Sequence, residues 1–303
     1  MTEVARIFVG CDPNDCDLEQ MMVLEYSLRK HASIPVEIHW MQMSRDPGSP
    51  WHSDPAADAG SDVGWRTERW VTPFSGFRWA IPELCGFNGR AIYMDADMIV
   101  LRDIASLWRM PIGPGKVLAA KGRKQRWRFC VTVWDCAAAR AHLPSLDDLK
   151  AAPAAHAERI RFFSEHPELM TPLHGDDNNV DGENQPVENI RILHYSDIGT
   201  QFSHRYAFDR LTAEGAKHWF EGEVLPHPRR DLQALFDRYY SEALAAGYTL
   251  DQYRVARPYG LLVKASQAHY TGNKATRKVS VWSRLKLRLR AHQRARGNEQ
   301  TAK

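Results

Sequence analysis

The residues most able to do chemistry lie in AIYMDADMIV, residues 91–100, where Asp95 and Asp97 are separated by one alanine and bordered by apolar segments. A buried carboxylate is costly unless a cation or hydrogen-bond donors compensate its charge. Carboxylate oxygens suit Mg²⁺ and Mn²⁺, which keep coordination positions for water and phosphates. The pair therefore predicts a divalent-cation site. The alternative is a structural role, in which Asp95 caps the next turn and Asp97 pairs with an arginine such as Arg102.

The segments around this pair alternate between strand and helix patterns. Apolar runs predict strands, and apolar residues at helical spacing behind an Asp17/Gln20 capping box predict a helix. This order predicts an open α/β sheet, which binds ligands at the carboxyl ends of its strands, where the acid pair lies. We expect strands over 6–11, 36–41, 90–94 and 98–101, and helices over 17–31 and 74–86, the latter bent or restarted at Pro82.

The remaining segments extend the same pattern. Residues 44–65 lack periodicity and predict a long surface loop. We expect strands over 116–120 and 130–134 joined by a basic connector, helices over 136–170, and an apolar strand over 190–193 that ends in His194.

Composition is that of an ordinary globular protein, since 44% of the 303 residues are hydrophobic and 25% are charged. No apolar run approaches the roughly 18 residues of a membrane-spanning helix, and the first residues do not resemble a secretory signal. The five cysteines include no CxxC pair, which argues against a disulfide framework and a zinc ribbon. These features predict a cytoplasmic protein with reduced cysteines.

The segment from the expected strand through DAD to MIVLRDIASLW, residues 91–108, resembles the nucleotide-sugar site of glycosyltransferase family 8. This GT-A-fold group includes glycogenin and bacterial lipopolysaccharide galactosyltransferases, in which an apolar strand enters a D-x-D and an R-D-I/L-x-x-L-W/F segment opens a helix. The resemblance covers roughly residues 6–205. It implies a GT-A type, Rossmann-like open mixed sheet flanked by helices, in a domain that we expect over 1–270.

The resemblance also assigns roles near the start of the chain. The family's first strand ends in a small-small-Asp loop that holds the nucleotide base, and Gly10, Cys11 and Asp12 stand in that place. The alternative for Asp12 is a simple Asx-turn before Pro13. A family arginine that reaches the donor falls on Arg78, for which a solvated or salt-bridged side chain is the alternative.

A late histidine of the family completes its metal site and falls on His194, before a diphosphate-binding loop that here contains Gly199 and Thr200. Imidazole is acceptable to Mn²⁺ beside carboxylates, and the alternative is a buried, hydrogen-bonded histidine. The family's Lys-Pro-Trp after the histidine is absent, which leaves the phosphate grip to other groups, such as Arg205. WRFC, residues 127–130, replaces an Asn-Ala-Gly motif, so the donor sugar and the acceptor stay open.

The resemblance at these positions implies a metal-dependent glycosyltransferase. A Mn²⁺ or Mg²⁺ ion on Asp95, Asp97 and His194 would offset the charge of a nucleoside diphosphate leaving a UDP-sugar, and Arg78 would add electrostatic help. The resemblance further implies transfer of a hexose, with retention, to a saccharide or lipid-linked acceptor.

The segment GDDNNVD, residues 175–181, allows several interpretations. Asp176 and Asp177 are the nearest candidates for an acceptor-side role, but acidic, Asn-rich runs are also typical of solvated loops. The spacing further matches the G-D-x-x-x-x-D of haloacid-dehalogenase-like, magnesium-dependent phosphatases, which also use D-x-D. Those enzymes carry the pair on their first strand, however, and their Gly-Asp closes an apolar strand, unlike HPELMTPLH before residue 175.

The last segment, which we treat as a separate tail over 271–303, is strongly basic. Residues 274–296 carry nine Lys or Arg and no acid, although the whole chain has a net charge of only +3. Val281, Trp282, Leu285 and Leu289 share a helical face, typical of a helix on an anionic membrane surface. Membrane attachment is favoured over nucleic-acid binding, for which stacking aromatics are lacking, and a solvated tail is the third alternative.

Overall fold

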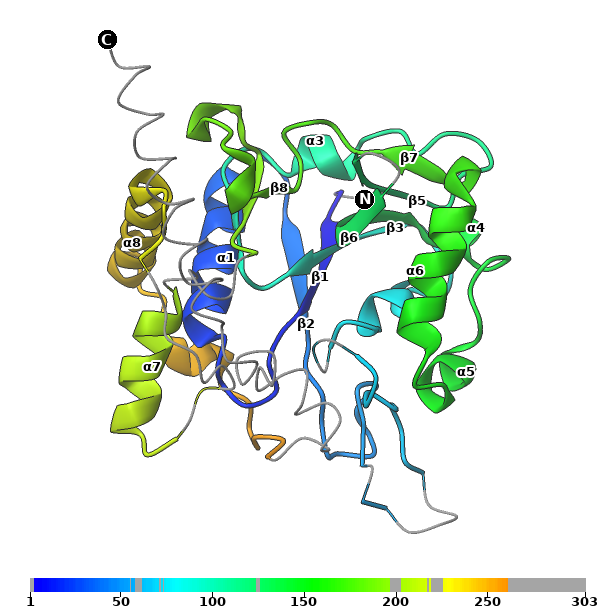
Figure 1. Cartoon of the computed structure of the whole chain (residues 1–303), viewed down its shortest axis with the longest axis horizontal. Helices are drawn as coiled ribbons and strands as arrows, with labels where there is room; N and C mark the ends of the chain where they lie inside the picture. Colours follow the sequence, from blue (N-terminus) through cyan, green and yellow to red (C-terminus); the bar gives the residue numbers. More distant parts are fainter. Residues whose placement is uncertain are drawn as a thin grey trace, which may run out of the picture.

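The computed structural model describes residues 3–54, 56–57, 62–70, 72, 74–123, 126–196, 203–216, 218 and 226–260 (Figure 1). The strands are β1 (Ala5–Gly10), β2 (Val36–Met41), β3 (Arg90–Asp95), β4 (Met98–Val100), β5 (Leu118–Arg123), β6 (Arg126–Asp135), β7 (Met170–Pro172), β8 (Asn179–Val180) and β9 (Ile192–His194). The α-helices are α1 (Leu18–His31), α2 (Ile81–Leu84), α3 (Ala105–Trp108), α4 (Cys136–Ala139), α5 (Leu146–Ala151), α6 (Ala155–Glu165), α7 (Ser203–Ala213) and α8 (Arg230–Ala245). Short 3₁₀ helices are η1 (Phe77–Trp79), η2 (Pro167–Leu169), η3 (Asp181–Glu183), η4 (Val187–Asn189) and η6 (Leu250–Tyr253).

Two mixed sheets form the centre of the molecule. The larger has the order β2-β1-β3-β6-β5-β7, and the smaller has the order β4-β9-β8. β1 pairs in parallel with β2 and β3, whereas β6 runs antiparallel to both β3 and β5. In the smaller sheet β9 pairs antiparallel with β4 and parallel with β8. The chain passes from the larger sheet to the smaller one at Asp95–Asp97.

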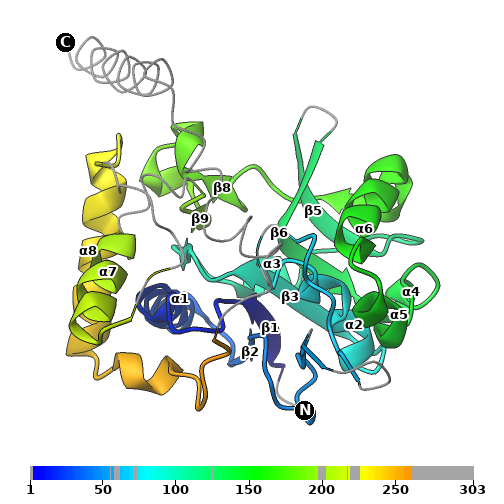
Figure 2. The same ribbon diagram turned by 60° about the horizontal axis from the view of Figure 1, so that its bottom comes forward.

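Helices cover both sides of the larger sheet. In Figures 1 and 2, α1, α7 and α8 lie on one side of it and α4, α5 and α6 on the other. β3 explains why both are needed, because Ala91, Ile92, Tyr93 and Met94 are all fully buried. Ile92 and Met94 pack with residues of α1, while Ala91 and Tyr93 pack in the cluster that holds Phe163 of α6. A strand buried on both faces is apolar throughout, as residues 91–94 are.

Most of the predicted elements are confirmed. Strands form at both ends of the α1 crossover, and Pro82 stands at the start of α2, directly after η1, where the predicted helix was expected to restart. The described part of 44–65 contains only isolated bridges. The predicted α/β class and open mixed sheet are confirmed.

Two expectations were wrong. The basic connector between the strands at 116–120 and 130–134 is itself strand over most of its length, because β5 extends to Arg123 and β6 begins at Arg126. Asp17 does stand at the N-terminus of α1, but its side chain makes no capping hydrogen bond, since Oδ2 accepts instead from the backbone N–H of Asp12 at 2.9 Å.

Two further expectations cannot be compared with the structure. The domain boundary at 270 and the tail at 271–303 lie outside the described residues. Within the described ranges, no helix has both the length and the apolar character that crossing a membrane requires.

A partly buried histidine on α6 should make the fold sensitive to acid. Trp79 Nε1 donates to Nδ1 of His156 at 3.0 Å, and burial, with a smaller effect of Arg78, lowers the pKa of His156 to about 3. The unfolded chain therefore takes up this proton near pH 6.5, so the stabilising contribution is present above that pH and is lost as pH falls. We expect His156→Phe to remove about 1–2 kcal/mol of the stability loss between pH 7 and pH 5, measured by urea unfolding.

His166→Gln is the matched control, because the His166 side chain is 46% exposed and pairs with Glu168. This variant should keep the wild-type difference between pH 7 and pH 5. An unchanged difference in His156→Phe would contradict the proposed origin of the acid sensitivity.

Candidate metal centre

Strand pairing brings His194 to the acid pair. Asp95 is the last residue of β3, Asp97 follows in a bend, and β4 then pairs antiparallel with β9 so that Met98 faces His194. The backbone N–H of Tyr195 extends this ladder to the carbonyl of Asp97 at 3.0 Å. The three side chains named by the D-x-D resemblance therefore meet because two short strands are held in one register.

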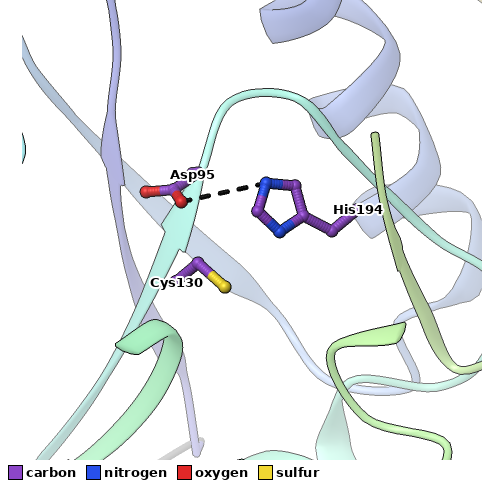
Figure 3. A group of neighbouring side chains, drawn as sticks. All are labelled: Asp95, Cys130 and His194. Carbon is purple, nitrogen blue, oxygen red and sulfur yellow. Dashed lines mark ion pairs between the residues drawn. The ribbon is translucent and has the colours of Figure 1, made fainter. Parts of the chain in front are cut away.

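The distances between these side chains suit a shared cation. His194 Nε2 lies 3.1 Å from Oδ1 of Asp97 and 4.0 Å from Oδ2 of Asp95, a pair marked in Figure 3. His194 is only 8% exposed. Oxygen and nitrogen ligands of one divalent cation lie about 2.0–2.2 Å from it, so small shifts would bring these atoms into one coordination shell.

Electrostatic interactions link the side chains of the centre. Burial opposes a charge on His194, but Asp97 and Cys130 together outweigh it and raise the pKa of the imidazole well above its usual value. Burial likewise raises the pKa of Asp95, and the positive charges of Arg78 and His194 counteract that rise. The negative groups around His194 thus favour positive charge at this position, which a metal ion would also supply.

Arg78, on η1, lies beside Asp95 and is not solvated. It is 8% exposed, its Nη2 is 3.3 Å from Oδ1 of Asp95, and its guanidinium stacks on the Tyr93 ring at 4.3 Å. Nε donates to the carbonyl of Ser75 at 2.8 Å, and Nη2 also donates to the Tyr93 hydroxyl at 3.0 Å. Arg78 is therefore salt-bridged, as its structural alternative predicted, and the salt bridge is to the D-x-D itself.

Sequence reasoning missed Cys130, which lies on β6. Its Sγ, a carboxylate oxygen of Asp95 and a ring nitrogen of His194 all lie within 4.8 Å of one another (Figure 3). The available signal was its place in WRFC, where the resembled family carries Asn-Ala-Gly. Its proximity to Asp95 depends on the β3–β6 pairing, which is not local in the sequence.

The residues present fit a divalent cation. Two carboxylates, an imidazole and a thiol supply oxygen, nitrogen and sulfur donors, which together can hold first-row transition ions. His194 Nδ1 and Asn178 Nδ2 are buried without a hydrogen-bond partner among the described residues. Such atoms cost free energy, and a ligand in the centre could reorganise them.

The base-binding candidates form a tight turn after β1. Oδ1 of Asp12 accepts from the backbone N–H groups of Asn14 at 2.6 Å and Cys16 at 3.1 Å, so the Asx-turn is present. Oδ2 of Asp12 is buried without a hydrogen-bond partner in the described chain, and burial raises the pKa of this carboxyl to about 6. Cys11 is fully buried in the core and can offer a ligand only its backbone.

Gly10 approaches two aromatic side chains. A Cβ there would lie 2.8 Å from Cδ2 of Phe74 and 2.9 Å from the hydroxyl of Tyr93. The structure therefore explains this glycine by its protein neighbours rather than by a nucleotide.

The acceptor-side candidates are engaged by an arginine. Arg191 Nη2 is 3.2 Å from Oδ2 of Asp176, and Arg191 Nε is 2.9 Å from Oδ1 of Asp177, which is 1% exposed. Burial raises the pKa of Asp177 to about 6. These acids are therefore not a solvated run. The remaining phosphate-loop candidates, Gly199 and Thr200, lie outside the described residues.

A pocket of about 320 Å³ opens next to this segment. It is lined by Lys121, Gly122, Gly175, Asn179, Glu183 and Gln185. Its polar lining is held in place by Glu183, which pairs with Arg128 at 2.8 Å and Lys121 at 3.6 Å.

Comparisons with known proteins bear on both site and fold. Residues 66–141 match the family described as Glycosyl transferase family 8. The chain is 36% identical over 104 residues to Protein CDI of Arabidopsis thaliana, which covers 34% of this chain and 35% of that protein. It resembles the apo-form glycosyltransferase GlyE of Streptococcus pneumoniae, with a TM-score of 0.50 and 16% identity over 84% of this chain and 65% of that chain.

The bifunctional glycosyltransferase WbbM is similar with a TM-score of 0.49 and 13% identity, covering 81% of this chain and 50% of that chain. The chain thus spans less than two thirds of each of these three proteins. The likeness to GlyE supports the fold, and the match over 66–141 includes Arg78, Asp95 and Asp97. The predicted resemblance to family 8 is confirmed for residues 66–141, and the fold is of the GT-A type.

Proposed function

We propose that this chain is a metal-dependent glycosyltransferase that moves a hexose from a UDP-sugar to a saccharide or lipid-linked acceptor, with retention of anomeric configuration. One observation carries the proposal. Asp95 and Asp97, which lie inside the stretch matched by family 8, meet His194 from a distant part of the sequence within 3.1–4.0 Å. Donor identity and retention follow from the family resemblance alone.

The side chains of the centre would have separate roles in metal binding and in stabilising the leaving group. A bound Mn²⁺ or Mg²⁺ supplies Lewis-acid neutralisation of the leaving diphosphate. Asp95, Asp97 and His194 would hold it, and His194 would give up its proton to do so. Arg78 is fixed by Ser75, Tyr93 and Asp95, so its positive charge is already oriented when charge develops on the leaving group.

The turn after β1 would receive the nucleotide base. The buried Oδ2 of Asp12 is an acceptor without a partner in the described chain, and an N–H on the edge of a uracil could satisfy it. Gly10 and Cys11 would contribute backbone, and Gly199 and Thr200 stay predictions for the diphosphate.

The proposed binding site for the acceptor rests on the pocket and on the neighbouring ion pairs. The 320 Å³ pocket has the size and polar lining for part of a saccharide, and Arg191 fixes Asp176 and Asp177 in the same region. Attachment to an anionic membrane through 274–296, and a cytoplasmic location on the inner membrane face, also stay predictions.

The phosphatase hypothesis lacks a comparable observation. Asp181, the second acid of its spacing, accepts from Ser196 Oγ at 3.1 Å and lies 3.2 Å from Nε2 of His227. The D-x-D pair also follows the third strand of the chain rather than the first.

Metal and nucleotide sugar should stabilise the protein jointly. We expect Mn²⁺ with a UDP-hexose to raise the melting temperature more than the sum of the two separate shifts, because each completes the other's site. Asp95→Asn and Asp97→Asn should remove most of the joint shift and slow transfer about 100-fold or more, since each removes a charged ligand.

Asp147→Asn makes the same chemical change on the exposed side of α5 and should behave as wild type. The absence of a joint shift across UDP-, GDP-, CDP- and ADP-sugars would refute the proposal. Equal shifts in wild type and Asp95→Asn would do so too, and magnesium-dependent hydrolysis of an aryl phosphate would favour the phosphatase.

Asp12→Asn separates base binding from folding. Asparagine keeps an oxygen for the N–H groups of Asn14 and Cys16 but loses the second carboxylate oxygen. The raised pKa of Asp12 means that its stabilising contribution is lost as pH rises through about 6, so the variant should be no less stable at pH 7. We expect UDP affinity, measured calorimetrically, to fall about tenfold; unchanged affinity would exclude Asp12 from the base site.

A further inference from the structure

The metal centre contains a donor that the proposed function does not use. The sulfur of Cys130 lies within 4.8 Å of donor atoms of both Asp95 and His194. Figure 3 shows these side chains converging from β3, β6 and β9, with the sulfur of Cys130 turned towards the histidine ring. Among the described residues, Asp95, Cys130 and His194 form a group whose donor atoms lie close enough together to bind one metal ion.

The backbone fixes the position of Cys130. β6 pairs antiparallel with β3, and Met94 faces Val131. Extending this register by one residue places Cys130 level with Asp95. The thiol therefore lies on a central strand of the sheet, next to the strand that ends in Asp95.

A buried amide stands behind the sulfur. Cys130 Sγ donates to Oδ1 of Asn178 at 3.2 Å, and Asn178 is fully buried with a left-handed backbone (φ 54°). Nδ2 of Asn178 has no hydrogen-bond partner among the described residues. A half-turn of the amide would present this N–H to a thiolate, as outer-shell donors do for metal-bound sulfur.

Metal ions bind a thiolate and a neutral imidazole. Any proton on the thiol or on the ring nitrogen would pass to solvent when a divalent cation binds, and no electron is transferred.

We propose that Cys130 is a ligand of the metal centre together with Asp95 and His194, and that its sulfur makes the centre prefer Zn²⁺ or Co²⁺ to Mg²⁺. Thiolate and imidazole favour such borderline ions, whereas Mg²⁺ favours an all-oxygen shell. This inference rests on the metal site of the proposed function and adds the identity of a ligand and of the preferred ion.

Cobalt(II) provides a direct test on the full-length protein after chelation. Wild type with Co²⁺ should show a sulfur-to-cobalt charge-transfer band in the near ultraviolet, which Zn²⁺ removes and excess Mg²⁺ does not. Cys130→Ser should abolish the band and weaken Co²⁺ binding about tenfold or more.

Cys85→Ser is the matched control, because Cys85 is also partly buried and its thiol interacts with that of Cys136. This variant should keep the band. Absence of a band in wild type, its persistence in Cys130→Ser, or its displacement by equimolar Mg²⁺ would each overturn the proposal.

A second measurement needs no variant and covers the case in which Cys130→Ser fails to fold. Native protein is treated with iodoacetamide with and without Zn²⁺, and alkylation is mapped by mass spectrometry. Zn²⁺ should protect Cys130 but not Cys85; equal alkylation of Cys130 in both samples would overturn the proposal.

The same samples separate this inference from the proposed function. A cobalt band that depends on Cys130, with no joint nucleotide-sugar shift, would support the ligand and refute the glycosyltransferase. A joint nucleotide-sugar shift without a Cys130-dependent cobalt band would support the glycosyltransferase and refute Cys130 as a ligand.

Discussion

The antiparallel pairing of β4 with β9 is the constraint on which the centre depends. β4 is only three residues long and begins directly after Asp97. β9 must therefore pair with it in one particular register for His194 to lie beside the two aspartates. Apolar packing supplies that register, because Ile99 and Leu193 are fully buried together with residues of α8. Tyr195 adds a hydrogen bond from its hydroxyl to the carbonyl of Leu232 at 2.8 Å. α8 therefore helps to set the geometry of a centre that it does not touch.

Much of the fold could be predicted from the sequence. β1, β2, β3 and α1 are strongly patterned, because they are buried by neighbours on both sides or along one face. Predictions failed where a non-local partner decided the outcome. The β5–β6 hairpin carries basic residues that are typical of a connector, and only pairing between the two strands makes it regular. The side chain of Asp17 is captured by the turn at Asp12 instead of capping its own helix.

The candidate site shows the same division. The acid pair could be named because it lies in the stretch 91–108 that resembles family 8. Arg78 and His194 could be named because they stand where the family carries an arginine and a late histidine. Cys130 could not, because its role depends on which strand lies beside β3. Arg191 was also missed as the partner of Asp176 and Asp177, since an ion pair between a loop and a residue just before a later strand leaves no local pattern.

The close contact at Gly10 links two parts of the centre that are remote in the sequence. Phe74 and the Tyr93 hydroxyl occupy the space that a larger residue at position 10 would need, and that hydroxyl donates to Asp95 and accepts from Arg78. Enlarging this glycine would displace a phenol shared by the acidic motif and its arginine. The size of the residue at the end of β1 therefore affects the hydrogen bonds between Tyr93, Asp95 and Arg78, so positions 10 and 95 are structurally coupled.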